Sequence, residues 1–205
     1  MQLNRRNLLA LFGMSLVSSV AVAADEKAKK HEWAKKPDIP TDFNPEEFFV
    51  ELMEKGEGVA LPTNKEGQMT VRMVFDSQCP WCVWQFKEFL PFVNQINFIW
   101  YPVAVLNPWS ELQGAAILSA SSPYEMFMEH EKHFKDPDFR GLDVRGKDYP
   151  FEKRQAVWNN SKVARRSGVR TVPFGVLQTR EGKFVPLNEI KTADFAKLTG
   201  LTPEK

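Results

Sequence analysis

The sequence predicts an α/β fold with a βαβ unit, a helical insertion and a closing ββα unit, preceded by a short N-terminal helical extension. Apolar, β-branched runs at 69–75 and 97–103 flank a segment of helical periodicity, within the roughly 35 residues that suit a right-handed βαβ unit. A strand-free stretch follows, and an apolar run at 172–177 then leads into a turn, a short strand and a last helix. The 205 residues suffice for one ordinary domain with a sizeable core.

The composition excludes several classes of protein. The chain has 27 Lys and Arg against 26 Asp and Glu, a formal net charge of +1 without a basic footprint, so nucleic acid is not an expected partner. A hydrophobic content of 43% argues against a disordered chain. The 2 cysteines can form one bridge at most, which excludes a disulfide-stapled mini-protein.

The first 24 residues have the order of a bacterial signal peptide, with Arg5 and Arg6, an apolar run over 8–22 and small residues up to Ala24. The alternative is a membrane-spanning helix, but the run is shorter than the roughly 20 residues that a span requires. The paired arginines are compatible with both the twin-arginine and the general secretory route. The sequence therefore predicts a periplasmic protein, and removal of two of the 27 basic residues leaves 25 against 26 acidic ones.

Residues 25–67 are expected to form a flexible charged arm and one short helix. Asn44 is a typical N-cap, Pro45 suits the first turn, and Gly56 ends the helix. The stretch 56–67 is expected to be a connector. The predicted buried face of the helix consists of Phe48, Phe49, Leu52 and Met53.

Residues 68–205 are expected to form the main α/β domain, with its first two strands at 69–75 and 97–103. Steps of three and four residues between these strands predict a helix after Pro80, with a buried face at Val83, Phe86, Leu90 and Val93. Further helices are expected at 111–120, 123–134, 151–167 and 192–198, the last capped by Gly200. A turn at 180–183 is expected to join the strands at 172–177 and 184–187.

Cys79 and Cys82 form a Cys-x-x-Cys motif where a strand meets a helix, the arrangement used in thiol-disulfide exchange. Cys79 is expected at the helix N-terminus, where free N–H groups and the helix dipole stabilise a thiolate and lower its pKa. Cys82 follows nearly one turn later, close enough for a disulfide and less exposed to substrate. We therefore expect Cys79 to attack and Cys82 to resolve the mixed disulfide. Pro80 suits the first helical turn, and Trp81 is expected beside the sulfur in a docking surface.

Two other roles of the cysteine pair compete with redox chemistry. A structural disulfide would close a loop of a few residues and gain little chain entropy. A metal site would need two more ligands, and the histidines are His31 in the charged arm and His130 and His133 on an apparently solvated helix face. No metal or other cofactor is therefore expected beyond the redox-active disulfide. A periplasmic metal-binding or metal-delivery protein is the alternative from another class.

Thr171, Val172 and Pro173 stand immediately before an apolar strand. Together with the upstream cysteine motif and the helical insertion, they predict a cis-proline loop that faces the cysteines. The backbone of Val172 would then pair with an extended substrate segment. Further candidates for substrate contact are Thr171, Trp84 and Phe174.

These residues resemble exported bacterial thiol:disulfide interchange proteins of the DsbC/DsbG type. The resemblance covers about residues 69–200 and is carried by the stretches 74–82, 114–123 and 167–173. It implies a thioredoxin-like fold with a helical insertion, and Cys79, Cys82 and Pro173 as active-site residues. It also implies a periplasmic reductase or isomerase of protein disulfides. The implied partners are cysteine-containing exported proteins as substrates and a membrane or periplasmic redox partner.

The sequence departs from that pattern in two places. Those isomerases carry an N-terminal dimerisation domain, whereas only about 45 residues lie between the predicted cleavage site and the first strand here. A monomer or weak dimer is therefore expected. In those isomerases a threonine usually precedes the cis-proline, whereas Val172 precedes Pro173 in this sequence. An apolar residue at this position resembles the DsbA-like oxidases. A DsbA-like thiol oxidase is therefore the alternative direction of catalysis.

Overall fold

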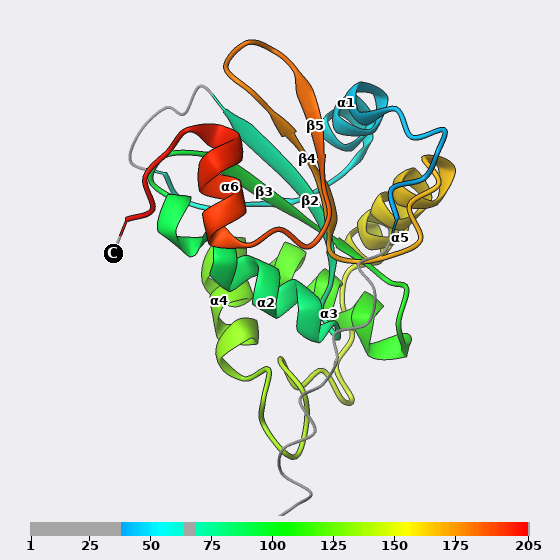
Figure 1. The fold of residues 1–205 in the computed structure, drawn as a ribbon. Helices are drawn as coiled ribbons and strands as arrows, with labels where there is room; N and C mark the ends of the chain where they lie inside the picture. Colours follow the sequence, from blue (N-terminus) through cyan, green and yellow to red (C-terminus); the bar gives the residue numbers. More distant parts are fainter. Residues whose placement is uncertain (1–37, 64–68, 205) are drawn as a thin grey trace, which may run out of the picture. The chain divides into compact units, whose positions relative to one another are not determined.

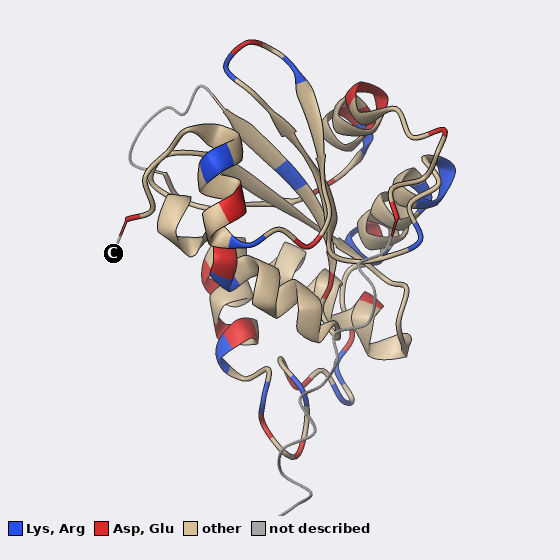
Figure 2. Ribbon diagram, viewed as in Figure 1, with Lys and Arg blue, Asp and Glu red and all other residues tan. Residues whose placement is uncertain are grey.

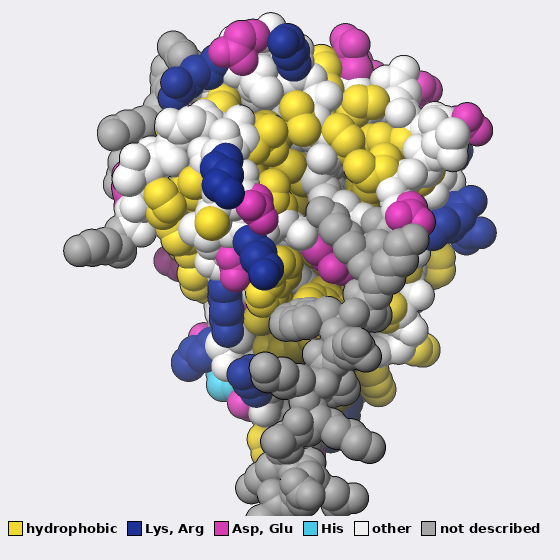
Figure 3. Space-filling view, in the orientation of Figure 1, with side chains coloured by type: hydrophobic (Ala, Val, Ile, Leu, Met, Phe, Trp, Pro, Cys, Tyr) yellow, Lys and Arg dark blue, Asp and Glu magenta, His cyan; other side chains and the backbone are white. Residues whose placement is uncertain are grey.

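The computed structural model describes residues 38–63 and 69–204. The predicted signal peptide, His31 and most of the charged arm lie outside these residues. Among the described residues, no helix combines the length and the hydropathy that a membrane span requires. Charged side chains of both signs are interspersed along the chain and over the face that is drawn in space-filling form (Figures 2 and 3).

The described residues form a five-stranded sheet with the strand order β1-β3-β2-β4-β5 (Figure 1). Its strands are Val59–Ala60 (β1), Thr70–Asp76 (β2), Asn97–Val103 (β3), Phe174–Gln178 (β4) and Phe184–Leu187 (β5). β2 and β3 are parallel, whereas β1 pairs antiparallel with β3, β4 with β2, and β5 with β4. The parallel pair and the helix between its strands form the predicted βαβ unit.

Helices cover both faces of this sheet (Figure 1). They are α1 (Pro45–Lys55), α2 (Pro80–Phe89), α3 (Pro108–Ser119), α4 (Pro123–Lys132), α5 (Phe151–Arg166) and α6 (Thr192–Thr199). α2, α4 and α6 contribute to the hydrophobic core on one face, while α1 and the C-terminal half of α5 contribute to the core on the other. α3 packs against α4, α5 and β3. The order βαβ, helical insertion, ββα, with a helix ahead of it, confirms the predicted fold class.

The two cores follow from the period of two along the strands. In β2, Val71, Met73 and Phe75 point into the first core and Val74 into the second. The first core is largely aromatic, and Phe195 of α6 illustrates its packing: the ring lies 4.6 Å from Phe89, 5.1 Å from Phe92 and 6.2 Å from Phe98 between centroids.

Three local predictions are wrong. β1 lies inside the predicted connector 56–67, where two residues are too few to show a strand period. Met53 is 51% exposed, because it lies about 100° around α1 from the buried Leu52. Leu90 is 42% exposed, because α2 ends at Phe89 and the helical period does not continue into the 3₁₀ turn over Leu90–Phe92; Phe89 and Phe92 are buried instead.

We predict that Phe195→Ala lowers the free energy of unfolding by about 3–5 kcal/mol, because it leaves a cavity among the rings of the first core. Urea unfolding of the purified protein measures this loss. Leu198→Ala, on the exposed side of the same helix, is the matched control and should stay within about 0.5 kcal/mol of the wild type. Equal losses in the two variants would contradict the packing described for α6.

Candidate active site

The two cysteines lie at the N-terminus of α2. Cys79 is the N-cap residue, with an extended backbone, and Pro80 occupies the first helical position. The carbonyl oxygen of Cys79 accepts a hydrogen bond from the N–H of Cys82 at 3.2 Å, so the helix begins between the two thiols. Both cysteines are free thiols in this structure. Their exposed fractions are nearly equal, 4% for Cys79 and 3% for Cys82. These fractions do not distinguish the two cysteines, whereas the sequence predicts that Cys82 is the less exposed.

The electrostatics of the two thiols do differ. The pKa of Cys79 is lowered, chiefly because the Cys82 side chain hydrogen bonds to its sulfur, against an opposing effect of burial. The backbone N–H groups of Cys82 and Trp81 at the helix start lower it further. The pKa of Cys82 is raised well above its ordinary value, first by burial and then by its hydrogen bond to Cys79. One sulfur of the pair is thus prepared as a thiolate and the other as a thiol.

The predicted cis-proline loop lies against this pair. The Val172–Pro173 peptide bond is cis. The carbonyl oxygen of Val172 lies 3.5 Å from Sγ of Cys79 and accepts a hydrogen bond from its thiol. Thr171 and Val172 are partly exposed, whereas Pro173 is buried. The fold therefore brings together two segments that are 93 residues apart in the sequence.

The predicted aromatic contacts fall into two groups. Trp81 and Trp84 are both half-buried, and their rings meet edge to face with centroids 6.0 Å apart. The prediction that Phe174 contacts substrate is wrong, because its side chain is buried in the second core. Its ring centroid lies 5.0 Å from that of Phe43 and 5.9 Å from that of Phe48. The first residue of β4 points away from the cysteines because successive strand residues alternate between the two faces.

Asp76 is a site residue that the sequence analysis missed. Its carboxylate is buried at the end of β2 and accepts four hydrogen bonds. The donors are the N–H of Gln78 at 2.8 Å, the N–H groups of Val105 and Leu106 at 2.9 and 3.0 Å, and the hydroxyl of Ser110 at 2.7 Å. The available signal was an acid at the carboxyl end of a predicted parallel strand, three residues before Cys79.

Gln78 joins the cysteine loop to the helical insertion. Its side-chain amide donates to Oε1 of Gln113 at 2.6 Å and to the carbonyl of Arg140 at 3.2 Å. Arg140 in turn donates from its guanidinium to the carbonyl oxygen of Gln78 at 3.0 Å. The Nδ2 of Asn107 donates to Oε1 of Gln78 at 3.3 Å. The residue directly before Cys79 is thus held by three residues, two from α3 and its N-cap and one from the loop after α4.

His130 contradicts the prediction of a solvated helix face. It is fully buried, its Nε2 lies 2.8 Å from the carbonyl oxygen of Ser77, and its Nδ1 accepts from the N–H of Leu142 at 3.3 Å. Burial lowers its pKa from 6.5 to about 4. Gly141, with φ of +74°, lies so close that a Cβ there would overlap the imidazole ring. No local signal revealed this burial, because the neighbours of His130 in the sequence are charged.

His133 lies in different surroundings from His130. It is partly exposed, and its ring nitrogens lie 2.6 Å from Asp136 and 2.8 Å from Glu129, which raise its pKa. Within residues 38–63 and 69–204, no group of three His, Cys, Asp or Glu side chains could hold a metal ion. The two histidines that the metal-binding alternative invokes are therefore not brought together with the cysteines as a ligand set.

No protein-family model and no curated protein matches the sequence. Solved structures resemble the fold. A periplasmic thioredoxin-like protein from Salmonella enterica serovar Typhimurium has a TM-score of 0.59 at 14% identity, covering 75% of this chain and 94% of its own. The catalytic domain of Proteus mirabilis ScsC has a TM-score of 0.58 at 13% identity, covering 73% and 91%. A thioredoxin-like oxidoreductase from Silicibacter pomeroyi DSS-3 has a TM-score of 0.52 at 19% identity, covering 72% and 92%. The fold is therefore thioredoxin-like.

Replacing Cys82 should change the acidity of Cys79. Cys82→Ala removes the side chain that does most to stabilise the Cys79 thiolate, so the pKa of Cys79 should rise. Cys82→Ser keeps a hydroxyl donor and should raise it less. The ultraviolet absorbance of the thiolate, followed against pH, measures both shifts. If the two variants titrate like the wild type, the helix N-terminus alone sets this pKa and the assigned hydrogen bond is wrong.

The buried His130 should make the protein less stable in mild acid. Its imidazole stays neutral in the folded state down to a pKa of about 4, whereas the unfolded chain binds this proton near 6.5. Between these two pH values the unfolded state therefore holds more protons than the folded state. The contribution of His130 to the free energy of unfolding consequently falls by about 3 kcal/mol on acidification. Glu131 has the opposite effect on stability. Burial raises its pKa from 4.5 to about 7, so on acidification the folded state binds this proton at a higher pH than the unfolded state does, which stabilises the folded state.

Two single variants separate these effects. Urea unfolding between pH 7 and pH 4 should show that His130→Gln loses less stability on acidification than the wild type, while Glu131→Gln loses more. Parallel profiles for His130→Gln and the wild type would show that the imidazole titrates alike in both states, contrary to its burial against Ser77.

Proposed function

We propose that this chain is a periplasmic thiol-disulfide oxidoreductase that acts on protein disulfides through Cys79 and Cys82. The observation that carries the proposal is the position of Cys79 as the N-cap residue of α2, one turn before Cys82 and 3.5 Å from the carbonyl oxygen of Val172 in the cis-proline loop. The opposed shifts of the two thiol pKa values support it. A lowered pKa supplies the nucleophile, and a raised pKa keeps the second thiol protonated until it is needed. The names of the similar structures, periplasmic thioredoxin-like protein and thioredoxin-like oxidoreductase, support the same class.

In the reducing direction, the Cys79 thiolate attacks one sulfur of a substrate disulfide. A Cys79-substrate disulfide forms, and the other substrate sulfur leaves as a thiolate that takes up a proton. The Cys82 thiol then loses its proton and attacks Sγ of Cys79, which releases the second substrate thiol and leaves the Cys79-Cys82 disulfide. The substrate gains two electrons and the cysteine pair loses two. The oxidising direction is the same sequence in reverse.

Within this class we propose a reductase or isomerase, on the resemblance of the cysteine, helical and cis-proline stretches to the DsbC/DsbG type. Its substrates would be cysteine-containing exported proteins, and a membrane or periplasmic redox partner would restore the starting state of the pair. The second candidate is a DsbA-like oxidase. The stabilised Cys79 thiolate favours that direction, because stabilising the reduced form makes the disulfide a stronger oxidant.

The reduction potential of the Cys79-Cys82 pair separates these candidates. Equilibration with glutathione buffers measures it, and insulin reduction together with refolding of scrambled ribonuclease assigns the activity. A low potential with insulin reduction indicates a reductase, and ribonuclease refolding without added oxidant indicates an isomerase. A high potential with oxidation of reduced ribonuclease as the sole activity would favour the oxidase.

We predict that Cys79→Ser abolishes exchange with protein disulfides, because no thiolate remains at the helix N-terminus. Cys82→Ser should instead accumulate mixed disulfides, since the attack still occurs but the resolving thiol is missing. Non-reducing gels and mass spectrometry of the complexes measure both outcomes. Exchange by Cys79→Ser at the wild-type rate would overturn the proposed function.

A further inference from the structure

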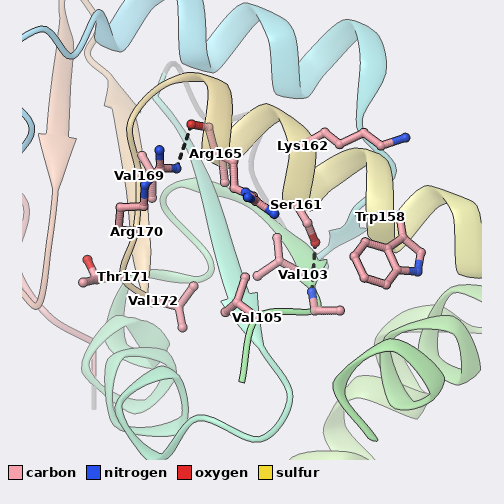
Figure 4. Close-up of a pocket in the computed structure, with 12 residues that line it drawn as sticks. Val103, Val105, Trp158, Ser161, Lys162, Arg165, Val169, Arg170, Thr171 and Val172 are labelled. Atoms are coloured by element: carbon pink, nitrogen blue, oxygen red, sulfur yellow. Dashed lines mark hydrogen bonds between the residues drawn. The ribbon is translucent and has the colours of Figure 1, made fainter. Parts of the chain in front are cut away.

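A groove of about 630 Å³ lies directly beside the cis-proline loop (Figure 4). α5 forms one wall, the end of β3 and the segment after it form the floor, and Thr171 and Val172 form the far end. Val172 belongs to the groove and also contacts Cys79 through its carbonyl oxygen at 3.5 Å. A molecule bound in the groove would therefore lie next to the reactive sulfur.

Apolar side chains form part of the lining of the groove. Val105 is 47% exposed and Trp158 is 44% exposed, and both line the groove together with Val172. The hydroxyl of Ser161 is already satisfied, because it accepts from the N–H of Ala104 at 2.9 Å and donates to a carbonyl one turn earlier in α5. The groove thus offers apolar surface for side chains, and its Ser161 hydroxyl is already hydrogen-bonded within the protein.

The apolar surface continues along α5. A second cavity of about 350 Å³ shares Trp158 and Lys162 with the groove and adds Phe151, whose side chain is 73% exposed. Exposed aromatic side chains that line one cavity are typical of contact surfaces. We call the two cavities together the α5 groove; it runs from the cis-proline loop to the N-terminus of α5.

The charged side chains of the α5 groove beside the cis-proline loop are all positive. Lys162, Arg165 and Arg170 line the larger cavity, and no acidic residue does. Among the ion pairs between described residues, none involves these three cations, although Arg170 donates to the carbonyl oxygen of Arg165 at 2.8 Å (Figure 4). Arg154, at the smaller cavity, is already paired with Glu111 at 2.6 Å. The cations of the larger cavity are thus available to an anionic partner.

We propose that the α5 groove binds an extended segment of the substrate polypeptide, with acidic side chains facing Lys162, Arg165 and Arg170 and apolar side chains on Val105 and Trp158. The proposal rests on the proposed function and specifies its substrate class. Charge complementarity selects the acidic groups, and the continuity of the groove with Val172 places the bound segment within reach of Cys79. Substrates would therefore be unfolded segments with acidic and apolar residues near the reactive cysteine.

Binding of cysteine-free peptides tests this proposal apart from any exchange chemistry. Fluorescently labelled peptides of about ten residues that alternate acidic and apolar side chains are titrated with the full-length protein, and anisotropy measures the affinity. A matched peptide with lysine in place of each acid should bind about ten-fold more weakly or worse, and affinity for the acidic peptide should fall with added salt.

Variants of the groove locate the binding. The double variant Lys162→Gln/Arg165→Gln should weaken binding of the acidic peptide about five- to ten-fold, and Trp158→Ala should weaken it similarly. Arg180→Gln, in the hairpin turn, and Leu198→Ala, on α6, change one charge and one exposed apolar residue elsewhere and should leave it unchanged. Exchange with the uncharged hydroxyethyl disulfide should stay at the wild-type rate in every groove variant.

The outcomes separate the two proposals. Peptide binding that depends on the groove in a protein without disulfide exchange would retain the groove and overturn the proposed function. Disulfide exchange with equal affinity for the acidic and lysine peptides, or with no loss in the groove variants, would overturn the groove proposal alone. Self-association that disappears in Trp158→Ala, measured by sedimentation, would assign the groove to a second copy of the chain and overturn it as well.

Discussion

The arrangement of the site depends on the buried carboxylate of Asp76. A buried charge is costly unless hydrogen bonds replace its water, and four donors do so here. Those donors come from the cysteine loop, from the segment after β3 and from α3, so the carboxylate is satisfied only when all three segments are in place. The same contacts position Gln78, just before Cys79, and Val105, on the floor of the α5 groove.

The helical insertion supports the cysteine loop in a second way. Ser77 is held by the imidazole of His130 from α4, and Gln78 by Gln113 of α3 and by Arg140. These partners are hydrogen-bonded groups in a buried environment, where an unmatched donor or acceptor would be expensive. The insertion therefore fixes the two residues before Cys79, and with them the start of α2, on which the low pKa of Cys79 partly depends.

The sequence predicted what periodicity and local chemistry determine. Strand and helix periods gave the fold class, and the Cys-x-x-Cys motif with Pro80 gave the helix N-terminus. Burial that depends on distant segments could not be predicted in this way. His130 stands among charged neighbours, and only its contact with Ser77, 53 residues away, makes it a buried group. Phe174 follows the cis-proline directly, yet the sheet turns it into the core against Phe43.

The asymmetry of the thiols depends on burial, on the helix start and on the hydrogen bond within the pair. Cys79 and Cys82 are almost equally covered, but the hydrogen bond between them stabilises the thiolate of one and the protonated form of the other. That hydrogen bond exists only in the dithiol and is lost when the disulfide forms. It therefore stabilises the reduced pair relative to the oxidised pair. Gln78 and His130 support the backbone of the loop, and the charge of Asp76 also acts on the pKa of both thiols. The hydrogen bond within the pair and the helix start therefore act directly on the reduction potential, and the α5 groove meets the pair at Val172, whose carbonyl oxygen accepts from the Cys79 thiol.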